Sequence, residues 1–525
     1  MKSAYIEIDP HRTVGSVDDK VYGHFLESNF FGNIEGGVFD EGSPLALGGD
    51  GPERGLRRDV IQACRDLGLP IVRWPGGNFA SAYHWEDGIG PRSQRPRRLE
   101  LAWHGEESNR FGTDEFLAWC AAVGTEPYLV NSCRNIDEAV HWLEYTNSTA
   151  DTAYARMRPR NKPYGVRYWG IGNEVYGDWQ VGHRSAERYA EDAREHATFL
   201  RAADPSIRLI GVGNEREEWL RPLLRRAGRL LDYVSLHLYG ASTHLFTGAA
   251  EVDVIAAQSL YFEERIEATA RLIESLAGEV GLPQAPAIAL DEWNMRHLEP
   301  TSWPEPHPGA RGGIADRDTD PDAPTDDLRV NRWSTRTMAD VLFYAGVFHA
   351  IHRLSGMAAA PRMANTVNLI NANAPIQVRP TGVVRTATYH VWDLYQNHLG
   401  RTVLPTEVES PARRRAIRQG DNRLPGGGFD TRGGIVPALD VVATRSAEGI
   451  QVAAINRDHD TIRATLRIGG APAPAHAHVR DIVADVLAVN SLDQSELVCL
   501  TDRGIQPAAS YDFPPYSVTL LSFAT

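Results

Sequence analysis

The sequence has few cysteines, very few lysines and no long apolar run. Of its 525 residues only four are cysteines, and lysine stands only at positions 2, 20 and 162. No two cysteines form a CxxC pair, so neither a disulfide framework nor a zinc ribbon is expected. The longest apolar stretch, residues 341–351, is far shorter than the roughly 18 residues of a membrane span. These absences exclude an integral membrane protein and a disulfide-stabilised secreted domain.

Positive charge is also scarce. Lys and Arg number 54 against 68 Asp and Glu, which gives a formal net charge of −14, and no dense basic stripe is present. Such a chain repels a phosphate backbone, so we expect no nucleic-acid partner. The first ten residues, MKSAYIEIDP, alternate like a strand and lack the apolar core of a signal peptide. We therefore expect a cytoplasmic protein, with a hydrophobic content of 42% that is ample for a core.

From about residue 21 to residue 368, short apolar runs alternate with segments of helical period. We count eight such runs, at residues 21–27, 70–75, 126–131, 166–174, 207–213, 233–239, 287–294 and 357–368. One helical stripe ends at Gly68 and contains Leu56, Val60, Ile61, Cys64 and Leu67. Eight parallel strands joined by crossover helices predict an α/β fold, a (β/α)8 TIM barrel, because that fold buries each strand on both faces. A doubly wound sheet is the alternative.

The helical period fades after Val391. Short alternating segments at residues 439–444, 450–456, 462–468 and 517–523 predict a C-terminal antiparallel β-sandwich. The N-terminal strand at residues 4–8 is expected to join this sandwich. We therefore place the catalytic barrel at residues 20–385 and the β-sandwich domain at residues 1–19 plus 386–525. The glycine-rich stretch 426–434 is expected to be a turn.

Residues 299–327 are dominated by proline, glycine and aspartate and show no periodicity. This composition predicts a long loop after the seventh barrel strand. In a barrel the loop would lie over the carboxyl-end face, where active sites are found. A lid, an oligomer contact and plain disorder are all compatible with this composition.

Two glutamates follow apolar strands and are candidates for catalysis. Glu174 ends the run YWGIGNE, and Glu292 lies in IALDEWN, 118 residues later. A proton donor and a nucleophile at the ends of the fourth and seventh strands are the apparatus of retaining glycoside hydrolysis, which needs two carboxyl groups about 5–5.5 Å apart. Asn173 could bind the sugar 2-hydroxyl, and Tyr239 could hold the nucleophile by a hydrogen bond. A single strand-end glutamate more often caps a helix or pairs with an arginine.

Six motifs follow one another along the chain: GHFLE at 23–27, RWPGGNF at 73–79, WEDGIGP at 85–91, RRLELAWHGEESNRFG at 97–112, GIGNE at 170–174 and DEWN at 291–294. Together they resemble glycoside hydrolase family 51, the intracellular-type α-L-arabinofuranosidases. The resemblance covers essentially the whole chain. It implies a barrel plus a sandwich, with Glu174 as general acid/base and Glu292 as nucleophile. It also implies that the furanose is bound, or the carboxylates organised, by Glu27, Arg73, Asn78, Trp103, Asn173, His237 and Tyr239.

The resemblance implies no metal and no cofactor, and the sequence shows no HExxH motif. The implied partner is a furanoside-containing oligosaccharide, processed by an exo-acting enzyme. Because the family commonly forms hexamers built from dimers, a homo-oligomer is expected.

Departures from the family pattern cluster around substrate binding. Ser28 stands where the family usually has His, Arg296 stands where an aromatic residue is usual, and Asn365 replaces a Gln in the last barrel strand. We expect Arg296 and Asn365 to contact the substrate, with more room and more hydrogen-bond donors at the rim of the site. This raises a same-class alternative, a β-D-galactofuranosidase, because galactofuranose adds one exocyclic hydroxymethyl carbon to the same ring stereochemistry.

Two rivals belong to other classes. One is a catalytically silent carbohydrate-binding protein on the same barrel, because a fold alone does not imply a function. The other is a metal-dependent barrel isomerase with Glu27, Glu174, His237 and Glu292 as ligands. The presence of both Glu174 and Glu292 favours the hydrolase.

Overall fold

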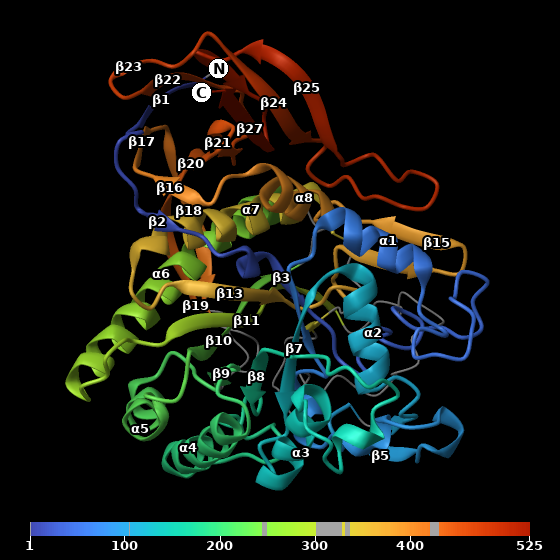
Figure 1. The fold of residues 1–525 in the computed structure, drawn as a ribbon. Helices are drawn as coiled ribbons and strands as arrows, with labels where there is room; N and C mark the ends of the chain where they lie inside the picture. The colour runs from blue at the N-terminus through green and yellow to red at the C-terminus, as the bar shows by residue number, and fades with distance from the viewer. Residues whose placement is uncertain are drawn as a thin grey trace.

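The computed structural model describes residues 2–103, 105–243, 249–300, 328–330, 336–419 and 430–524. Its lower part in Figure 1 is a closed barrel surrounded by helices, and its upper part is built from β-sheets. No helix of the described part is long and apolar enough to cross a membrane.

The barrel contains eight parallel strands in the spatial order β10-β9-β8-β7-β4-β3-β13-β11, closed by pairing of β10 with β11. These strands are β3 (Gly23–Phe25), β4 (Ile71–Trp74), β7 (Glu126–Asn131), β8 (Tyr168–Ile171), β9 (Arg208–Gly211), β10 (Tyr233–Thr243), β11 (Ala287–Pro300) and β13 (Pro361–Thr366). Each coincides with one of the eight predicted apolar runs. The barrel prediction is therefore confirmed, and closure rules out the doubly wound alternative.

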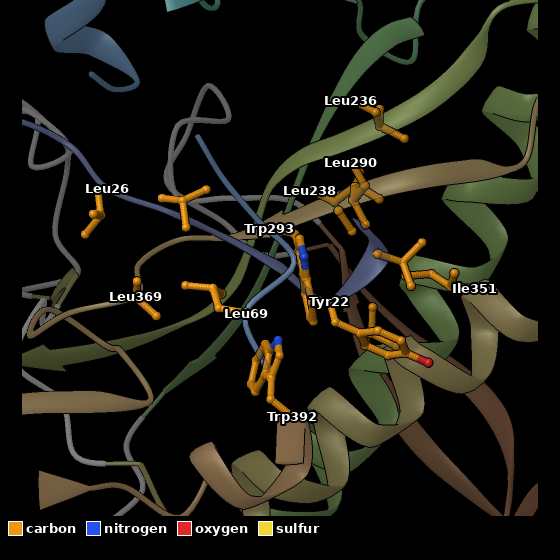
Figure 2. Packing of buried hydrophobic residues seen from close by; sticks show 14 of the residues in the cluster. Tyr22, Leu26, Leu69, Leu236, Leu238, Leu290, Trp293, Ile351, Leu369 and Trp392 are labelled. Atoms are coloured by element: carbon orange, nitrogen blue, oxygen red, sulfur yellow. The ribbon is translucent and has the colours of Figure 1, made fainter. Parts of the chain in front are cut away.

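The helices cover the outside of the barrel. They are α1 (Arg58–Leu67), α2 (Thr113–Val123), α3 (Ile136–Asn147), α4 (Ala186–Ala203), α5 (Glu217–Ala227), α6 (Ala249–Glu279), α7 (Met338–Arg353) and α8 (Tyr389–His398). Helix α1 ends where its stripe predicts, since Gly68 has φ 68°, a left-handed conformation that favours glycine. Figure 2 shows the packing between strand and helix: Trp293 of β11 stacks on Trp392 of α8 with ring centres 6.1 Å apart.

Two sheets form the upper part. One contains β17 (Thr406–Glu409), β1 (Lys2–Ile8), β22 (Ile462–Ile468), β23 (Ala471–Pro472) and β26 (Ser510–Phe513). The other contains β2 (Gly15–Ser16), β16 (Thr402–Leu404), β20 (Leu439–Ser446), β21 (Gly449–Asn456), β27 (Ser517–Ala524), β24 (His476–Val483) and β25 (Leu500–Pro507). The predicted sandwich strands are present, and the N-terminal strand pairs with β17 and β22. The bounds of the two domains, residues 20–385 for the barrel and residues 1–19 plus 386–525 for the β-sandwich, stay predictions.

The second sheet is buried on both faces. Val441 and Val452 belong to a core shared with the first sheet, whereas Val442 and Ile455 belong to the core that continues into the barrel helices. The same contact carries an ionic link, in which Asp440 of β20 accepts from Arg353 of α7 at 2.7 Å. This two-sided burial fixes the sandwich against the side of the barrel formed by α7 and α8.

Short strands complete the fold: β5 (Arg98–Glu100) with β6 (Gly105–Glu107), β14 (Ile376–Arg379) with β15 (Gly382–Arg385), β18 (Ala412–Gln419) with β19 (Asp430–Pro437), and β12 (Leu328–Val330) beside β11. The turn predicted at 426–434 is wrong for its second half, because Gly433 and Gly434 belong to β19 and pair with β18. Residues 426–429 lie outside the described part. The loop predicted at 299–327 is wrong at its start, where β11 continues to Pro300. Residues 301–327 lie outside the described part.

Candidate active site

The candidate residues meet at the carboxyl ends of neighbouring barrel strands. Glu174 follows β8 with a φ of 41°, a conformation that a non-glycine residue adopts at a cost. The side chain of Glu174 is only 6% exposed. Its Oε1 lies 2.7 Å from Nδ1 of His237, a residue of β10. The indole of Trp179 donates to Oε2 at 3.0 Å, and the hydroxyl of Tyr176 lies 3.4 Å from Oε1. The backbone of Glu174 is therefore held in an unusual conformation that directs its carboxyl group into this cluster.

Glu292 lies on β11, beside the strand that carries His237. Nη1 of Arg73 donates to Oε1 of Glu292 at 2.8 Å, and the hydroxyl of Tyr239 donates to Oε2 at 2.7 Å. Carboxylate oxygens of Glu174 and Glu292 and a ring nitrogen of His237 all lie within 4.8 Å of one another. Two donors thus fix the carboxylate of Glu292 next to that of Glu174.

Arg73 connects the two strand ends. Its side chain is fully buried, and its Nη2 donates to Oδ1 of Asn173 at 2.6 Å while Nη1 holds Glu292. The amide of Asn173 points on to Oδ1 of Asn78, at 3.5 Å. A guanidinium with its fork shared between a carboxylate and an amide has little freedom to move. The position of Asn173, next to Glu174, is therefore tied to that of Glu292.

A bulge in β11 brings a third carboxylate into the barrel. Ser235 pairs with Ala289 but His237 pairs with Glu292, so β11 has one more residue than β10 over this stretch. Bulges change the direction of side chains, which allows both Asp291 and Glu292 to reach groups inside the barrel. Asp291 accepts from the hydroxyls of Tyr128 at 2.9 Å and Ser235 at 2.7 Å.

His237 lies among these three carboxylates. Burial alone would lower its pKa, but Glu292, Asp291 and Glu174 favour the charged ring and raise the pKa to about 10. Asp291 shows the reverse effect: burial would raise its pKa, whereas Arg73 and His237 lower it. His237 therefore carries a positive charge at neutral pH, and this charge lies beside the carboxyl group of Glu174.

The charge of His237 predicts a pH-dependent contribution to stability. The pKa of His237 is about 6.5 in the unfolded chain and about 10 in the folded protein, so protonation of this ring stabilises the folded state. The full stabilisation is present below about pH 6.5, and it is lost as the pH rises towards 10. We expect His237→Gln to lower the Tm most near pH 6, with a difference from wild type that shrinks between pH 7 and 10. Thermal melts across that range measure the difference. His459→Gln, at an exposed histidine, is the matched control, and a pH-independent effect of His237→Gln would contradict the assignment.

Glu27, after β3, occupies a separate buried position. Its Oε1 accepts from the backbone N–H of Phe79 at 2.9 Å and from the indole of Trp103 at 3.0 Å. Burial raises the pKa of Glu27 to about 8, and the negative charge of Glu292 adds to this effect. The hydrogen bond from the N–H of Phe79 acts in the opposite direction. The carboxyl group is therefore largely protonated at pH 7 and can donate a hydrogen bond through its other oxygen.

The glycines of RWPGGN make room for Glu27. A Cβ placed on Gly77 would lie 2.7 Å from Oε1 and 2.8 Å from Oε2 of Glu27, and one on Gly76 would lie 2.9 Å from its Cγ. The backbone after β4 can therefore approach this carboxyl group only because these side chains are missing.

Arg296, Asn365 and Ser28, the departures from the family pattern, are as buried as the two catalytic glutamates, and substrate contact by Arg296 and Asn365 stays a prediction. The guanidinium of Arg296 lies 3.7 Å from the ring centre of Tyr239, the phenol that holds Glu292. Asn365 has no exposed surface, and its amide donates to the carbonyl of His24 on the neighbouring strand at 2.9 Å. Ser28 accepts from the indole of Trp74 at 3.2 Å.

Sequence reasoning missed Asp291 and Trp179 as site residues. Strict alternation along a strand would send Asp291 and Glu292 to opposite faces, and the bulge that overrides it leaves no clear trace in the sequence. Trp179 lies in a loop without periodicity, and the presence of a tryptophan five residues after Glu174 is the one signal that the sequence offers.

The cluster is suited to acid–base and nucleophilic chemistry rather than to holding a metal ion. Glu174, His237 and Glu292 are close enough to share an ion. However, both oxygens of Glu292 already accept hydrogen bonds, one from Arg73 and one from Tyr239. A carboxylate held by two donors beside a second carboxyl group is the arrangement of a nucleophile and a proton donor.

Comparisons with known proteins agree over nearly the whole chain. Residues 63–256 match the model of the α-L-arabinofuranosidase 1 domain, and residues 291–517 match that of the α-L-arabinofuranosidase C-terminal domain. The chain is 34% identical to α-L-arabinofuranosidase C of Emericella nidulans, over 98% of this chain and 96% of that one. It is 32% identical to an intracellular exo-α-(1→5)-L-arabinofuranosidase of Streptomyces lividans, over 78% and 60%. The structure of a GH51 α-L-arabinofuranosidase from Thermotoga petrophila superposes with a TM-score of 0.82 at 33% identity, covering 99% of each chain.

Proposed function

Because the chain belongs to the GH51 α-L-arabinofuranosidase family, we propose that it is a retaining, exo-acting hydrolase that releases terminal α-L-arabinofuranosyl residues from oligosaccharides by double displacement. The observation that carries this proposal is the geometry of two carboxyl groups, with oxygens within 4.8 Å. Retaining enzymes need about 5–5.5 Å between the two groups, whereas inverting enzymes need about 6.5–9.5 Å to admit a water molecule. The close pair therefore favours retention.

Glu292 acts as the nucleophile in this mechanism. Its carboxylate attacks the anomeric carbon while Glu174, protonated, donates to the leaving oxygen, so that the glycosidic bond breaks as the ester bond to Glu292 forms. Arg73 and Tyr239 each donate to one oxygen of Glu292 and so orient its carboxylate for the attack. Glu174 then removes a proton from water, which attacks the same carbon and releases Glu292.

Glu174 has to change its protonation state between the two steps. Before the first step the negative charge of Glu292 disfavours a second charge nearby, and the ester removes that charge afterwards. His237 contacts Glu174 at 2.7 Å and Glu292 at 3.6 Å, and its positive charge helps Glu174 to ionise in the second step. The positive charge of His237, which lies near both carboxyl groups, thus helps Glu174 to change from proton donor to base.

The sugar is held by the polar groups around the pair. Asn173 is placed to bind the 2-hydroxyl, a contact that strengthens in the transition state. Asn78 lies next to Asn173, and the protonated Glu27, fixed by Trp103, offers a hydroxyl donor. Arg296, which lies over the ring of Tyr239, and Asn365, whose amide binds the carbonyl of His24, complete the proposed substrate-binding set.

Gly77→Ala tests the role of Glu27 without removing a polar group. The new Cβ would displace a carboxyl group that is buried and doubly hydrogen-bonded. We expect KM for an aryl arabinofuranoside to rise about tenfold or more and stability to fall by roughly 1–3 kcal/mol. Steady-state kinetics and thermal melts measure both. Gly278→Ala, where an added Cβ meets nothing within 4 Å, is the control, and an unchanged KM in Gly77→Ala would refute the role.

A β-D-galactofuranosidase remains the alternative on the same scaffold. It would use the same carboxyl groups and needs room and partners for one hydroxymethyl group. Parallel hydrolysis of 4-nitrophenyl α-L-arabinofuranoside and β-D-galactofuranoside tests the proposal: the arabinoside is expected to react with the higher kcat/KM. Preference for the galactoside would replace the proposal with the alternative, and inertness towards both would favour a carbohydrate-binding barrel.

The remaining expectations from the sequence are also proposals. A metal-dependent isomerase would lose activity after treatment with a chelator, whereas we expect hydrolysis to be unchanged, since both oxygens of Glu292 already accept hydrogen bonds from Arg73 and Tyr239. A cytoplasmic location agrees with the name of the Streptomyces relative. Fractionation of cells and light scattering of the purified protein test the location and the homo-oligomer.

A further inference from the structure

An open pocket of about 390 Å³ lies outside the carboxylate cluster, between α3 and α4. The two helices are neighbours at the bottom of the view in Figure 1. The pocket is lined by Cys133, Arg134, Asn135, Ile136, Asp137, Arg184, Arg188, Asp192, His196 and Phe199. Neither catalytic glutamate belongs to its wall, so the mechanism above leaves this pocket without a role.

One face of α4 gives the pocket an aromatic ring and a polar edge. Arg188, Asp192 and Phe199 recur at helical spacing, and the ring of Phe199 is 49% exposed. Nε of Arg188 is bound to Asp192 at 3.1 Å, and the described residues provide no partner for its two terminal nitrogens. The pocket therefore contains the exposed ring of Phe199 together with guanidinium N–H groups of Arg188 that can donate to a ligand.

The opposite wall, at the start of α3, adds an acceptor and another donor. Oδ1 of Asn135 caps the helix by accepting from the N–H of Asp137 at 2.9 Å, which leaves the NH2 of the same amide to bind a ligand. The carboxylate of Asp137 has no hydrogen-bond partner among the described side chains and can accept from a hydroxyl group. Donors and acceptors thus face each other across the pocket.

The charges of the pocket nearly cancel. Arg184 is paired with Asp192 at 2.7 Å, and Arg134 is paired with Glu138 at 2.8 Å. A pocket with balanced charges does not select for an anion or a cation. A ring face flanked by guanidinium, amide and carboxylate groups instead fits a neutral ligand with an apolar C–H face and a rim of hydroxyl groups, which is the chemistry of a sugar.

The pocket is joined to the loop that carries Glu174. The backbone N–H of Arg184 donates to the carbonyl of Val175 at 2.8 Å, and its Nη2 donates to the carbonyl of Cys133 at 2.7 Å. In the proposed mechanism Glu174 faces the leaving group, which is the rest of the glycan chain. The pocket is thus connected by hydrogen bonds to the segment that carries the proton donor.

We infer that this pocket is a second carbohydrate-binding site, which holds a remote part of an oligosaccharide or polysaccharide chain while its terminal furanose is cleaved. The inference rests on the proposed function and extends it to substrates of several sugar units. Phe199 stacks on a sugar ring, and Arg188 and Asp137 bind its hydroxyl groups.

Kinetics of Phe199→Ala and Arg188→Ala test the site. Both side chains are exposed, so the variants are expected to fold. KM for linear α-(1→5)-arabinan should rise roughly three- to tenfold at unchanged kcat, whereas both constants for 4-nitrophenyl α-L-arabinofuranoside should stay as in wild type. Leu487→Ala and Arg156→Ala, at exposed positions elsewhere, are matched controls. An unchanged KM for arabinan in both variants would overturn the inference.

A binding assay separates this site from catalysis. Affinity electrophoresis in gels that contain linear arabinan is performed with Glu292→Ala alone and combined with Phe199→Ala. Weaker retardation of the double variant is expected, and equal retardation would overturn the second site. Light scattering of Phe199→Ala gives a further check, since a changed assembly would show that the ring packs against a second copy instead. Failure of the proposed function is recognised separately, as a wild type inert towards the aryl arabinofuranoside.

Discussion

Glu292→Ala is expected to lower kcat on an aryl arabinofuranoside by a factor on the order of 10⁴ or more. The variant removes the atom that attacks the anomeric carbon, and no other carboxylate can replace it, since Glu174 is bound to His237 and Asp291 to Tyr128 and Ser235. Steady-state kinetics with 4-nitrophenyl α-L-arabinofuranoside measure the loss.

The same variant has to remain folded for this result to count. Removal of Glu292 leaves Arg73 with Asn173 and Asp291 as partners, so circular dichroism should match that of wild type. Glu218→Ala, at a side chain with 73% exposure on α5, is the matched control and should keep full activity. Activity of Glu292→Ala near that of Glu218→Ala would show that the nucleophile is another group.

Glu174→Ala is expected to act differently on different leaving groups. Without the proton donor, hydrolysis of an arabino-oligosaccharide should fall by a factor on the order of 10³ or more, because its alkoxide leaving group needs the proton. Attack on a 4-nitrophenyl arabinofuranoside needs no such help, so its first step should be far less affected. Water attack in the second step lacks its base, and the ester on Glu292 should accumulate.

The accumulation of that ester is directly measurable. Rapid-quench kinetics of Glu174→Ala should show a burst of 4-nitrophenol, and mass spectrometry should find one pentosyl unit on the peptide that contains Glu292. Trp179→Phe, which removes the donor to Oε2 of Glu174, should give a milder loss of the same kind. Equal losses on both substrates, without a burst, would contradict the role of Glu174 as acid/base.

The barrel and its strand ends could be predicted because burial on both faces produces continuous apolar runs. The runs before Glu174 and Glu292 each ended at a polar residue, which placed these glutamates at the same face of the fold. The sandwich strands were recognisable from alternation. Apolar runs and alternation are set by residues that are close together in one strand, so they can be recognised in the sequence.

The details of the site depend on contacts between elements. The bulge that turns both Asp291 and Glu292 inward is defined by the pairing of β11 with β10, and neither strand shows it alone. Arg296 and Asn365 were expected to contact the substrate because they depart from the family pattern, but their packing against Tyr239 and His24 could not be read from the sequence. The predicted turn was wrong at residues 430–434 for a similar reason, since pairing with β18 overrides the preference of glycine for turns.

The stereochemistry of the first product tests the central claim most directly. Early ¹H NMR spectra of wild-type protein with 4-nitrophenyl α-L-arabinofuranoside distinguish the two anomers before mutarotation. Double displacement by Glu292 and Glu174 predicts that α-L-arabinofuranose appears first and the β-anomer only later. Initial formation of β-L-arabinofuranose would mean that water attacks directly, and it would contradict the assignment of Glu292 as nucleophile.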